Sequence, residues 1–318
     1  MKGHIRNIFP GGNTPLGFYS YYNDILPQRK AEKIFCIKGG PGTGKSTLMK
    51  GVGAYFADRG EDVDYLWCSS DPDSLDGVVL RKRNVALLDG TAPHVMDPQN
   101  PGAVDEIVNL GEYWNEKGLR AHRKEILDCH QRTGEMFRCV YGYLAAAGAR
   151  SAFLGDVLLR LAGEDGLFDA KQILHAKLGS VLAIRRAEAK RNRDSALGSR
   201  QRPGSEKRAF ASAISPDGIR NGLDSLVTGM EQVIVLNVTA GFPVQRILKP
   251  AAQRLLDAGF DLESYYCPMD PENKLEHILA PEAGLAVISS HEYHSLKNRT
   301  AGQKLMNISI DPAGKQQG

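Results

Sequence analysis

The stretch IFCIKGGPGTGKST, residues 34–47, decides the fold of this chain. Its first four residues are apolar and suit a buried parallel strand. Residues 39–47 then match the pattern G-x-x-x-x-G-K-[ST] completely. Leu48, Val52 and Phe56 follow at helical spacing. The stretch therefore predicts a strand, a glycine-rich loop and a helix in succession, which is the context that this pattern requires.

The residue types of this loop suit the binding of a phosphate chain. Glycines let the backbone wrap so that its N–H groups converge on phosphate oxygens, and the start of a helix adds positive dipole character. We expect Lys45 to reach the β- and γ-phosphates and Ser46 to ligate Mg²⁺. The predicted binding residues are Gly39, Gly40, Pro41, Gly42, Thr43, Gly44, Lys45, Ser46 and Thr47.

A second candidate magnesium ligand follows a later strand. Residues 63–67 and 85–88 read as further strands, and the second of them ends in Asp89. An apolar strand that ends in Asp is the Walker B arrangement, in which the carboxylate holds Mg²⁺ or its water. The alternative is an Asp that opens an ordinary turn before Gly90. We expect Asp89 to serve both as metal ligand and in catalysis.

The chain contains a second, diverged copy of this region. Residues 60–65, GEDVDY, align with residues 259–264, GFDLES, and Cys68 falls on Cys267. The second copy keeps the strand pattern at residues 233–236 but has lost the phosphate-binding groups. Pro250 also stands inside its first helix, where it should break that helix or reset its start. The positions of Gly39, Gly44, Lys45, Ser46 and Asp89 are taken by Val238, Pro243, Val244, Gln245 and Ser289.

These patterns predict an α/β protein, a duplicated P-loop NTPase fold with parallel sheets and a helical segment between the copies. The first domain should span residues 1–200 and include the helical segment, about 103–192. A polar, basic linker should run from Arg191 to Arg208. Residues 201–318 should form the degenerate second domain. It is shorter than the first domain, and we expect it to be an incomplete copy.

Four segments resemble a family of bacterial tandem P-loop ATPases whose activity is assigned by motif only. They read GNTPLGFYSYY, IKGGPGTGKSTLMK, CSSDPDSLDGV and DGTAPHVMDPQNPGAVDEIVNLGE. The resemblance covers most of the chain and implies ATP binding, without indicating a further substrate. This chain departs from the family in its degraded second loop. The loop GGPGTGKST is also similar to that of AAA-type ATPases, but Gly90 stands where those proteins carry a Glu.

Composition limits the remaining function classes. The net charge of +3 is too small to indicate nucleic acid or a membrane surface, and 42% hydrophobic residues suffice for ordinary cores. The five cysteines are odd in number and none form a CxxC pair, which argues against disulfides or a zinc site and favours the cytoplasm. No apolar run approaches the roughly 20 residues that span a bilayer.

Two further candidates stand near the strand ends. Asp71, with Asp73 and Asp76, follows the second strand and could bind water on Mg²⁺ or a phosphoryl acceptor; the alternative is a capped turn. His94 lies five residues after Asp89 and could sense the γ-phosphate or move a proton, or simply bond to backbone. We take both Asp71 and His94 as catalytic candidates.

The sequence thus leaves three functions open. The first is Mg-dependent hydrolysis of ATP at one N-terminal site, with Lys45, Ser46 and Asp89 stabilising the developing charge. The second is a kinase that transfers phosphate to a small molecule. The third is a slow nucleotide-gated switch or scaffold, whose helical segment or degenerate domain binds a protein partner. No NKxD-like guanine reader occurs in the expected place, which favours ATP over GTP.

Overall fold

The computed structural model describes residues 2–91, 96–195, 202–297 and 302–310. The chain divides into two compact units that are discontinuous in sequence. The N-terminal unit comprises residues 1–147 and 212–225, and the C-terminal unit comprises residues 148–211 and 226–318. The domain boundary expected at residues 200 and 201 lies outside the described residues.

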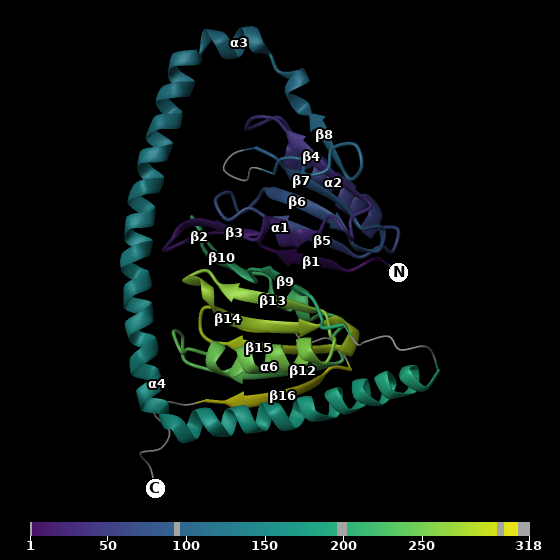
Figure 1. Cartoon of the computed structure of the whole chain (residues 1–318). Coiled ribbons are helices and arrows are strands. Elements are labelled where there is room, and N and C mark those ends of the chain that lie inside the picture. Colours follow the sequence, from purple (N-terminus) through teal and green to yellow (C-terminus); the bar gives the residue numbers. More distant parts are fainter. Residues whose placement is uncertain (1, 92–95, 196–201, 298–301, 311–318) are drawn as a thin grey trace. The chain divides into compact units, whose positions relative to one another are not determined.

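The N-terminal unit is built on a six-stranded sheet with the order β1-β5-β6-β7-β4-β8 (Figure 1). The strand β6 runs antiparallel to both its neighbours, whereas the other neighbouring pairs are parallel. The sheet is therefore mixed, and the prediction of a parallel sheet was wrong at β6. Its strands are β1 (Ile5–Ile8), β4 (Lys33–Lys38), β5 (Val63–Trp67), β6 (Leu75–Leu80), β7 (Val85–Asp89) and β8 (Asp105–Asn109).

Short connections explain the direction of β6. Only the turn at residues 68–74 joins β5 to β6, and the 3₁₀ helix η1 (Arg81–Arg83) joins β6 to β7. A parallel pair needs a crossover of a dozen or more residues, so connections this short produce antiparallel neighbours. In contrast, helix α2 (Lys45–Ala57) supplies a crossover after β4.

Helix α2 packs on this sheet through Met49, Gly53 and Ala57, which are buried, whereas Leu48 is exposed. A Cβ at Gly53 would lie 2.2 Å from Cε1 of Tyr65, so the close approach of the helix to the sheet requires glycine there. Every residue of β6 is buried. The core beneath α2 consists of Ile37, Met49, Ala57, Val63, Leu75, Val78 and Leu80.

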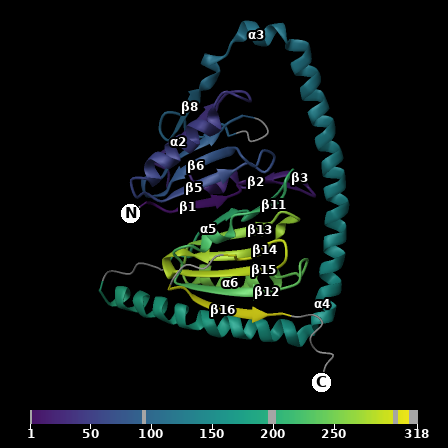
Figure 2. The same cartoon turned by 180° about the vertical axis from the view of Figure 1, so that it is seen from behind.

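Two hairpins also belong to the N-terminal unit, together with the short helix α1 (Tyr22–Ile25). One pairs β2 (Gly11–Thr14) with β3 (Gly17–Ser20), and the other pairs β10 (Ser212–Ser215) with β11 (Gly218–Asn221). The hairpins lie side by side (Figures 1 and 2), and Nδ2 of Asn13 donates to the carbonyl oxygen of Ile214 at 3.0 Å.

The predicted helical segment begins later than expected. Residues 105–109 form strand β8, which pairs with β4, so the prediction of a helix from residue 103 was wrong. In the strand, the adjacent residues Ile107 and Val108 point to opposite faces: Val108 packs against the core beneath α2, whereas Ile107 is exposed. The 3₁₀ helix η2 (Leu110–Tyr113) and helix α3 (Glu116–Ala121) follow. Helix α4 (Arg123–Ser195) is interrupted at Gly163, whose φ of 66° is not helical.

The C-terminal unit repeats the sheet of the N-terminal unit. Its strand order, β9-β13-β14-β15-β12-β16, matches the first sheet strand for strand, and β14 is again antiparallel to both neighbours. The expected linker, residues 191–208, overlaps α4 at residues 191–195 and β9 at residues 206–208, so the linker prediction was wrong at both ends. The strands are β9 (Glu206–Ala209), β12 (Gln232–Asn237), β13 (Leu262–Cys267), β14 (Asp270–Ala280), β15 (Leu285–Ser290) and β16 (Lys304–Ser309).

Helix α6 (Gln245–Asp257) takes the place of α2 and runs through Pro250 without a break. The predicted break was wrong because Pro250 faces outward, while buried Ile247, Ala251 and Leu255 hold the helix on the core. Helix α5 (Leu223–Val227) and the 3₁₀ helix η3 (Pro281–Ala283) complete the described elements. Among the described helices, none combines the length and apolar character needed to cross a bilayer.

Candidate functional site

The glycine-rich loop of the N-terminal unit, residues 39–44, lies between β4 and α2. Gly42 and Gly44 have φ angles of 76° and 86°, in the left-handed region that favours glycine. A Cβ at either position would meet nothing within 4 Å, so conformation rather than space requires glycine there. The loop turns in this way onto the start of α2, where the first N–H groups of a helix favour an anion.

Lys45 is the first residue of α2, and its side chain folds back into the loop. Its Nζ donates to the carbonyl oxygens of Gly39 at 2.6 Å and Gly40 at 3.0 Å. The same Nζ lies 3.6 Å from Oδ2 of Asp89, and the two side chains are 10% and 13% exposed. Asp89 reaches this position because β7 is the parallel neighbour of β4, with Asp89 paired to Ile37. The structure therefore brings these two predicted residues together.

The hydroxyl of Ser46 and the carboxylate of Asp89 are held by backbone donors. Oγ of Ser46 accepts from the N–H of Leu75 at 3.0 Å. Oδ1 of Asp89 accepts from the N–H of Thr91 at 2.8 Å, and Oγ1 of Thr91 donates to the carbonyl oxygen of Gly39 at 2.7 Å. Asp89 thus opens a turn, as the alternative interpretation expects, and it also faces Lys45; its role as a metal ligand stays a prediction. Hydroxyl and carboxylate oxygens are the hard ligands that Mg²⁺ prefers.

Lys38 is a residue near the site that sequence reasoning missed. Its Nζ donates to the carbonyl oxygens of Gly90 at 2.7 Å and Met96 at 3.2 Å, and to Oδ1 of Asp97 at 2.8 Å. Lys38 therefore ties the end of β4 to both ends of the segment that follows Asp89. The only signal in the sequence was a lysine at the end of an otherwise apolar strand, directly before the loop.

The acidic residues after β5 do not form one site. Asp71 accepts from the hydroxyl of Ser74 and closes a local turn, which is the structural alternative considered for it. The carbonyl oxygen of Asp73 accepts from Nζ of Lys50. Asp76 lies inside β6, where its buried Oδ2 accepts from the Tyr22 hydroxyl at 2.8 Å. Burial and this carboxylate hold the pKa of Tyr22 well above its usual range.

His94, the other catalytic candidate, lies outside the described residues. Cys68 is buried, and burial with the nearby Asp76 carboxylate raises the pKa of its thiol to about 12. This thiol is therefore protonated at neutral pH and is a poor nucleophile. Tyr21 and Tyr22, which precede β4, are both buried and so are not free to stack on a base.

A cavity of about 500 Å³ adjoins the glycine-rich loop. Part of its wall is the loop itself, at residues 41–43, and the rest comes from η2, the two residues that join η2 to α3, the middle of α3 and the residue after it. We call it the loop cavity. Its residues are Pro41, Gly42, Thr43, Leu110, Tyr113, Trp114, Asn115, Gly118, Leu119 and His122.

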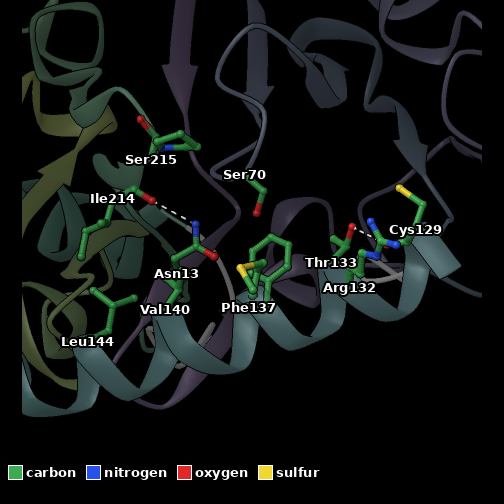
Figure 3. Close-up of a pocket in the computed structure, with 12 residues that line it drawn as sticks. Asn13, Ser70, Cys129, Arg132, Thr133, Phe137, Val140, Leu144, Ile214 and Ser215 are labelled. Atoms are coloured by element: carbon green, nitrogen blue, oxygen red, sulfur yellow. Dashed lines mark hydrogen bonds between the residues drawn. The ribbon is translucent and has the colours of Figure 1, made fainter.

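A second cavity of the N-terminal unit, about 460 Å³ in volume, lies along the first part of α4 (Figure 3). Phe137, Val140 and Leu144 project from one side of this helix toward Asn13 and Ile214 of the hairpins. The hydroxyl of Tyr141 donates to Oδ1 of Asn13 at 3.2 Å, so the helix is attached to the hairpin by a polar contact. The lining carries few charged groups, which suits an apolar occupant.

The corresponding loop of the C-terminal unit cannot bind phosphate in the same way. Val244 stands in place of Lys45 and is 1% exposed, as is Phe242. These apolar side chains pack into the core of the C-terminal unit. Ser289, in place of Asp89, is also buried. No cationic or anionic side chain replaces the pair formed by Lys45 and Asp89.

The C-terminal unit holds a buried polar cluster, Glu276, His277 and His294, whose potential ligand atoms lie within 4.8 Å of one another. Nζ of Lys274 lies 3.3 Å from Oε1 of Glu276, so an ammonium group already neutralises this carboxylate. Nδ1 of His277 accepts from the N–H of Ser289 at 3.2 Å, which places a ring proton on its other nitrogen. Burial lowers the pKa of His294 to about 4. The three residues therefore form a buried polar cluster in which Lys274 pairs with the Glu276 carboxylate.

No known protein family matches the sequence, and no curated protein or solved structure shows significant similarity to it. The resemblance to tandem P-loop ATPases, which rests on short segments, accordingly stays a prediction.

Proposed function

We propose that the N-terminal unit binds Mg-ATP at the glycine-rich loop and hydrolyses it. The observation that carries this proposal is the position of Lys45, whose ammonium group lies between two loop carbonyls and 3.6 Å from Asp89. Left-handed glycines before a helix start provide converging N–H groups for phosphate, and the lysine provides the cation. The pattern G-x-x-x-x-G-K-[ST] assigns the same lysine to the β- and γ-phosphates, which supports the proposal.

The roles of the residues follow from their contacts. Lys45 exchanges its carbonyl partners for phosphate oxygens and neutralises the charge that develops as the β–γ bond breaks. The Ser46 hydroxyl and the Asp89 carboxylate would hold Mg²⁺, either directly or through water. The metal, when bound, neutralises phosphate charge and fixes its orientation. Lys38 holds the segment after Asp89 against β4 and so keeps the carboxylate in place.

A group that orients the attacking water is also needed. Asp71 and His94 remain our candidates, and the exposed Asp71 can leave its turn with Ser74 at little cost because both groups are solvated. If neither contributes, hydrolysis is slow and unaided. Phosphate transfer to a small molecule stays an alternative, and the turnover experiment described below separates it from hydrolysis.

One observation favours the switch or scaffold as a second candidate function. The first part of α4 exposes large apolar residues, namely Ile126, Leu127, Met136, Val140 and Tyr143. Exposed apolar surface of this kind is typical of an interaction site. A protein partner of the switch would bind here. All five cysteines are free thiols, and we propose the cytoplasm, a reducing compartment, as the location.

A combined binding and turnover experiment tests the proposal. Calorimetry with Mg-ATP should give one equivalent per chain, because Val244 and Ser289 have replaced the charged pair in the C-terminal unit. Phosphate release measured with and without pooled metabolites then separates the functions. Release alone supports the hydrolase, ADP formation only with an acceptor supports the kinase, and binding with negligible turnover supports the switch. No binding of ATP at all would overturn the proposed site.

A further inference from the structure

We propose that the loop cavity receives the adenine base of ATP, with Trp114 as the stacking surface. This inference rests on the proposed function, since it assumes that the triphosphate lies on the glycine-rich loop. It adds the base specificity of the site and names the residue that carries it.

The first argument is the position of the cavity. Residues 41–43 belong both to the predicted phosphate-binding loop and to the wall of the cavity. A Cβ placed on Gly40 would lie 3.5 Å from Cζ2 of Trp114, so the indole is in van der Waals range of the loop. One nucleotide can therefore contact the loop with its phosphates and the indole with its base. The volume of about 500 Å³ lies in the usual range for small-ligand pockets.

The second argument is the exposure of the aromatic side chains. Trp114 is 45% exposed and Tyr113 is 84% exposed, although both are large and amphipathic. Neither belongs to the core beneath α2. Nucleotide bases stack on such aromatic faces, and each stacked base contributes on the order of 1–3 kcal/mol. Leu119, also 45% exposed, adds apolar area to the same cavity.

The third argument concerns the choice between adenine and guanine. The residues of the loop cavity include no Asp, Glu, Lys or Arg. Guanine presents N–H donors that need acceptors, and an unpaired donor that is removed from water weakens binding. The side-chain oxygen of Asn115 already accepts from the N–H of Gly118 at 3.1 Å. Adenine has fewer N–H donors on its pairing edge than guanine, so it loses less binding free energy through unpaired donors in this cavity.

The placement of the two tryptophans makes the test direct. Trp67 and Trp114 are the two tryptophans of the chain. Trp67 lies on β5, where its Nε1 donates to Oδ1 of Asn7 at 2.8 Å. In the variant Trp67→Phe, the fluorescence therefore reports Trp114 alone. We expect Mg-ATP to change this fluorescence strongly and inorganic triphosphate to change it little.

The affinity measurement uses full-length Trp114→Ala, with Trp114→Phe and Trp67→Phe as matched controls. Trp114→Ala should weaken the binding of ATP about 5- to 150-fold, because the stacking contribution is lost. The affinity for inorganic triphosphate should change by no more than about twofold. Trp114→Phe should keep most of the affinity, because it keeps an aromatic face. GTP should bind the wild type more weakly than ATP by about tenfold or more, from the unpaired donor.

Three results would overturn the inference, and they are distinguishable. Unchanged ATP affinity in Trp114→Ala, with Lys45→Ala still defective, would place the base elsewhere and leave the phosphate site intact. An equal loss of ATP and triphosphate affinity would mean that Trp114 only supports the loop. A wild-type chain that binds neither ATP nor triphosphate would overturn the proposed function as well.

Discussion

The substitution Lys45→Ala removes the cation on which the proposed site depends. In the structure this ammonium group donates to the carbonyl oxygens of Gly39 and Gly40, and it lies 3.6 Å from Asp89. When a triphosphate binds, these contacts are exchanged for hydrogen bonds to phosphate oxygens. The change in affinity is therefore the difference between two sets of contacts, and not the full energy of the new set.

The magnitude follows from that exchange. Hydrogen bonds that involve a charged group contribute about 1.5–3 kcal/mol each, and neutral ones about 1 kcal/mol. The ammonium group is charged in both states, so each bond to a carbonyl oxygen lies near the lower end of the charged range and each bond to an anionic phosphate oxygen near its upper end. Exchanging two such bonds gains about 1.5–3 kcal/mol for a lysine side chain that is only one-tenth exposed. At roughly 1.4 kcal/mol for each factor of ten, Lys45→Ala should weaken the binding of Mg-ATP about 10- to 150-fold.

Calorimetry with Mg-ATP measures this difference, and Lys50→Ala is the matched control. Lys50 is also a lysine of α2, but its Nζ donates to the carbonyl oxygen of Asp73 and not to the loop. Circular dichroism should show that both variants keep their helix content. If Lys45→Ala binds Mg-ATP within about threefold of the wild type, the phosphates do not lie on this loop and the site assignment is wrong.

Three further predictions concern the metal ligand, a buried ion pair and the thiols. Asp89→Asn should keep part of the nucleotide affinity but lose most of the phosphate release, since Asp89 acts through Mg²⁺; wild-type turnover in this variant would contradict its role. In Asp64→Asn, the buried guanidinium of Arg6 loses its carboxylate partner, whose two oxygens lie 2.7 Å from Nε and 2.8 Å from Nη2 of Arg6. The free energy of unfolding, measured by urea titration with tryptophan fluorescence, should fall by about 3–5 kcal/mol. An unchanged midpoint would show that this pair is dispensable. Iodoacetamide should label the native chain at two thiols, because the other three are buried. Mass spectrometry identifies the labelled residues, and rapid labelling of a buried thiol would contradict the packing. The reactive thiols are Cys129 and Cys139, and the protected ones are Cys36, Cys68 and Cys267.

The parts of the fold that the sequence predicted are those with a strong local signal. The apolar runs before the loop and at residues 63–67 became β4 and β5, and the residues after Gly44 became α2. The strand β6 was not predicted, although it is buried throughout, because its sequence LDGVVL contains an Asp and a Gly that local propensity assigns to a turn. Gly77 is needed there: a Cβ would lie 2.7 Å from Cδ2 of Leu88 on the neighbouring strand.

Other features depend on contacts between distant residues, which a single sequence does not reveal. Residues 105–109 show helical spacing, yet they pair with β4 and form β8. The hairpin β10–β11 follows residue 211 in the second copy but belongs to the N-terminal unit. For the site, the pattern identified Lys45, Ser46 and Asp89. Lys38 and Trp114 were missed because neither stands in a motif, and only the folded structure places them beside the loop.

The comparison of the two copies shows that the fold does not depend on the residues of the proposed phosphate site. Both sheets have the same strand order, and in both the antiparallel strand follows from a short connection. The glycine-rich loop contributes little to the core of the N-terminal unit, since Lys45 and Asp89 face each other and not the apolar cluster beneath α2. In the C-terminal unit, Phe242 and Val244 fill the equivalent loop and are buried. Such apolar replacements bury additional apolar surface. They also remove two charged groups, each of which needs either a ligand or the other charged group as its partner. The second loop therefore stabilises its own unit. The first loop instead holds the partly buried ammonium group of Lys45, whose desolvation costs stability, and we infer that this cost is retained because the group binds an anion.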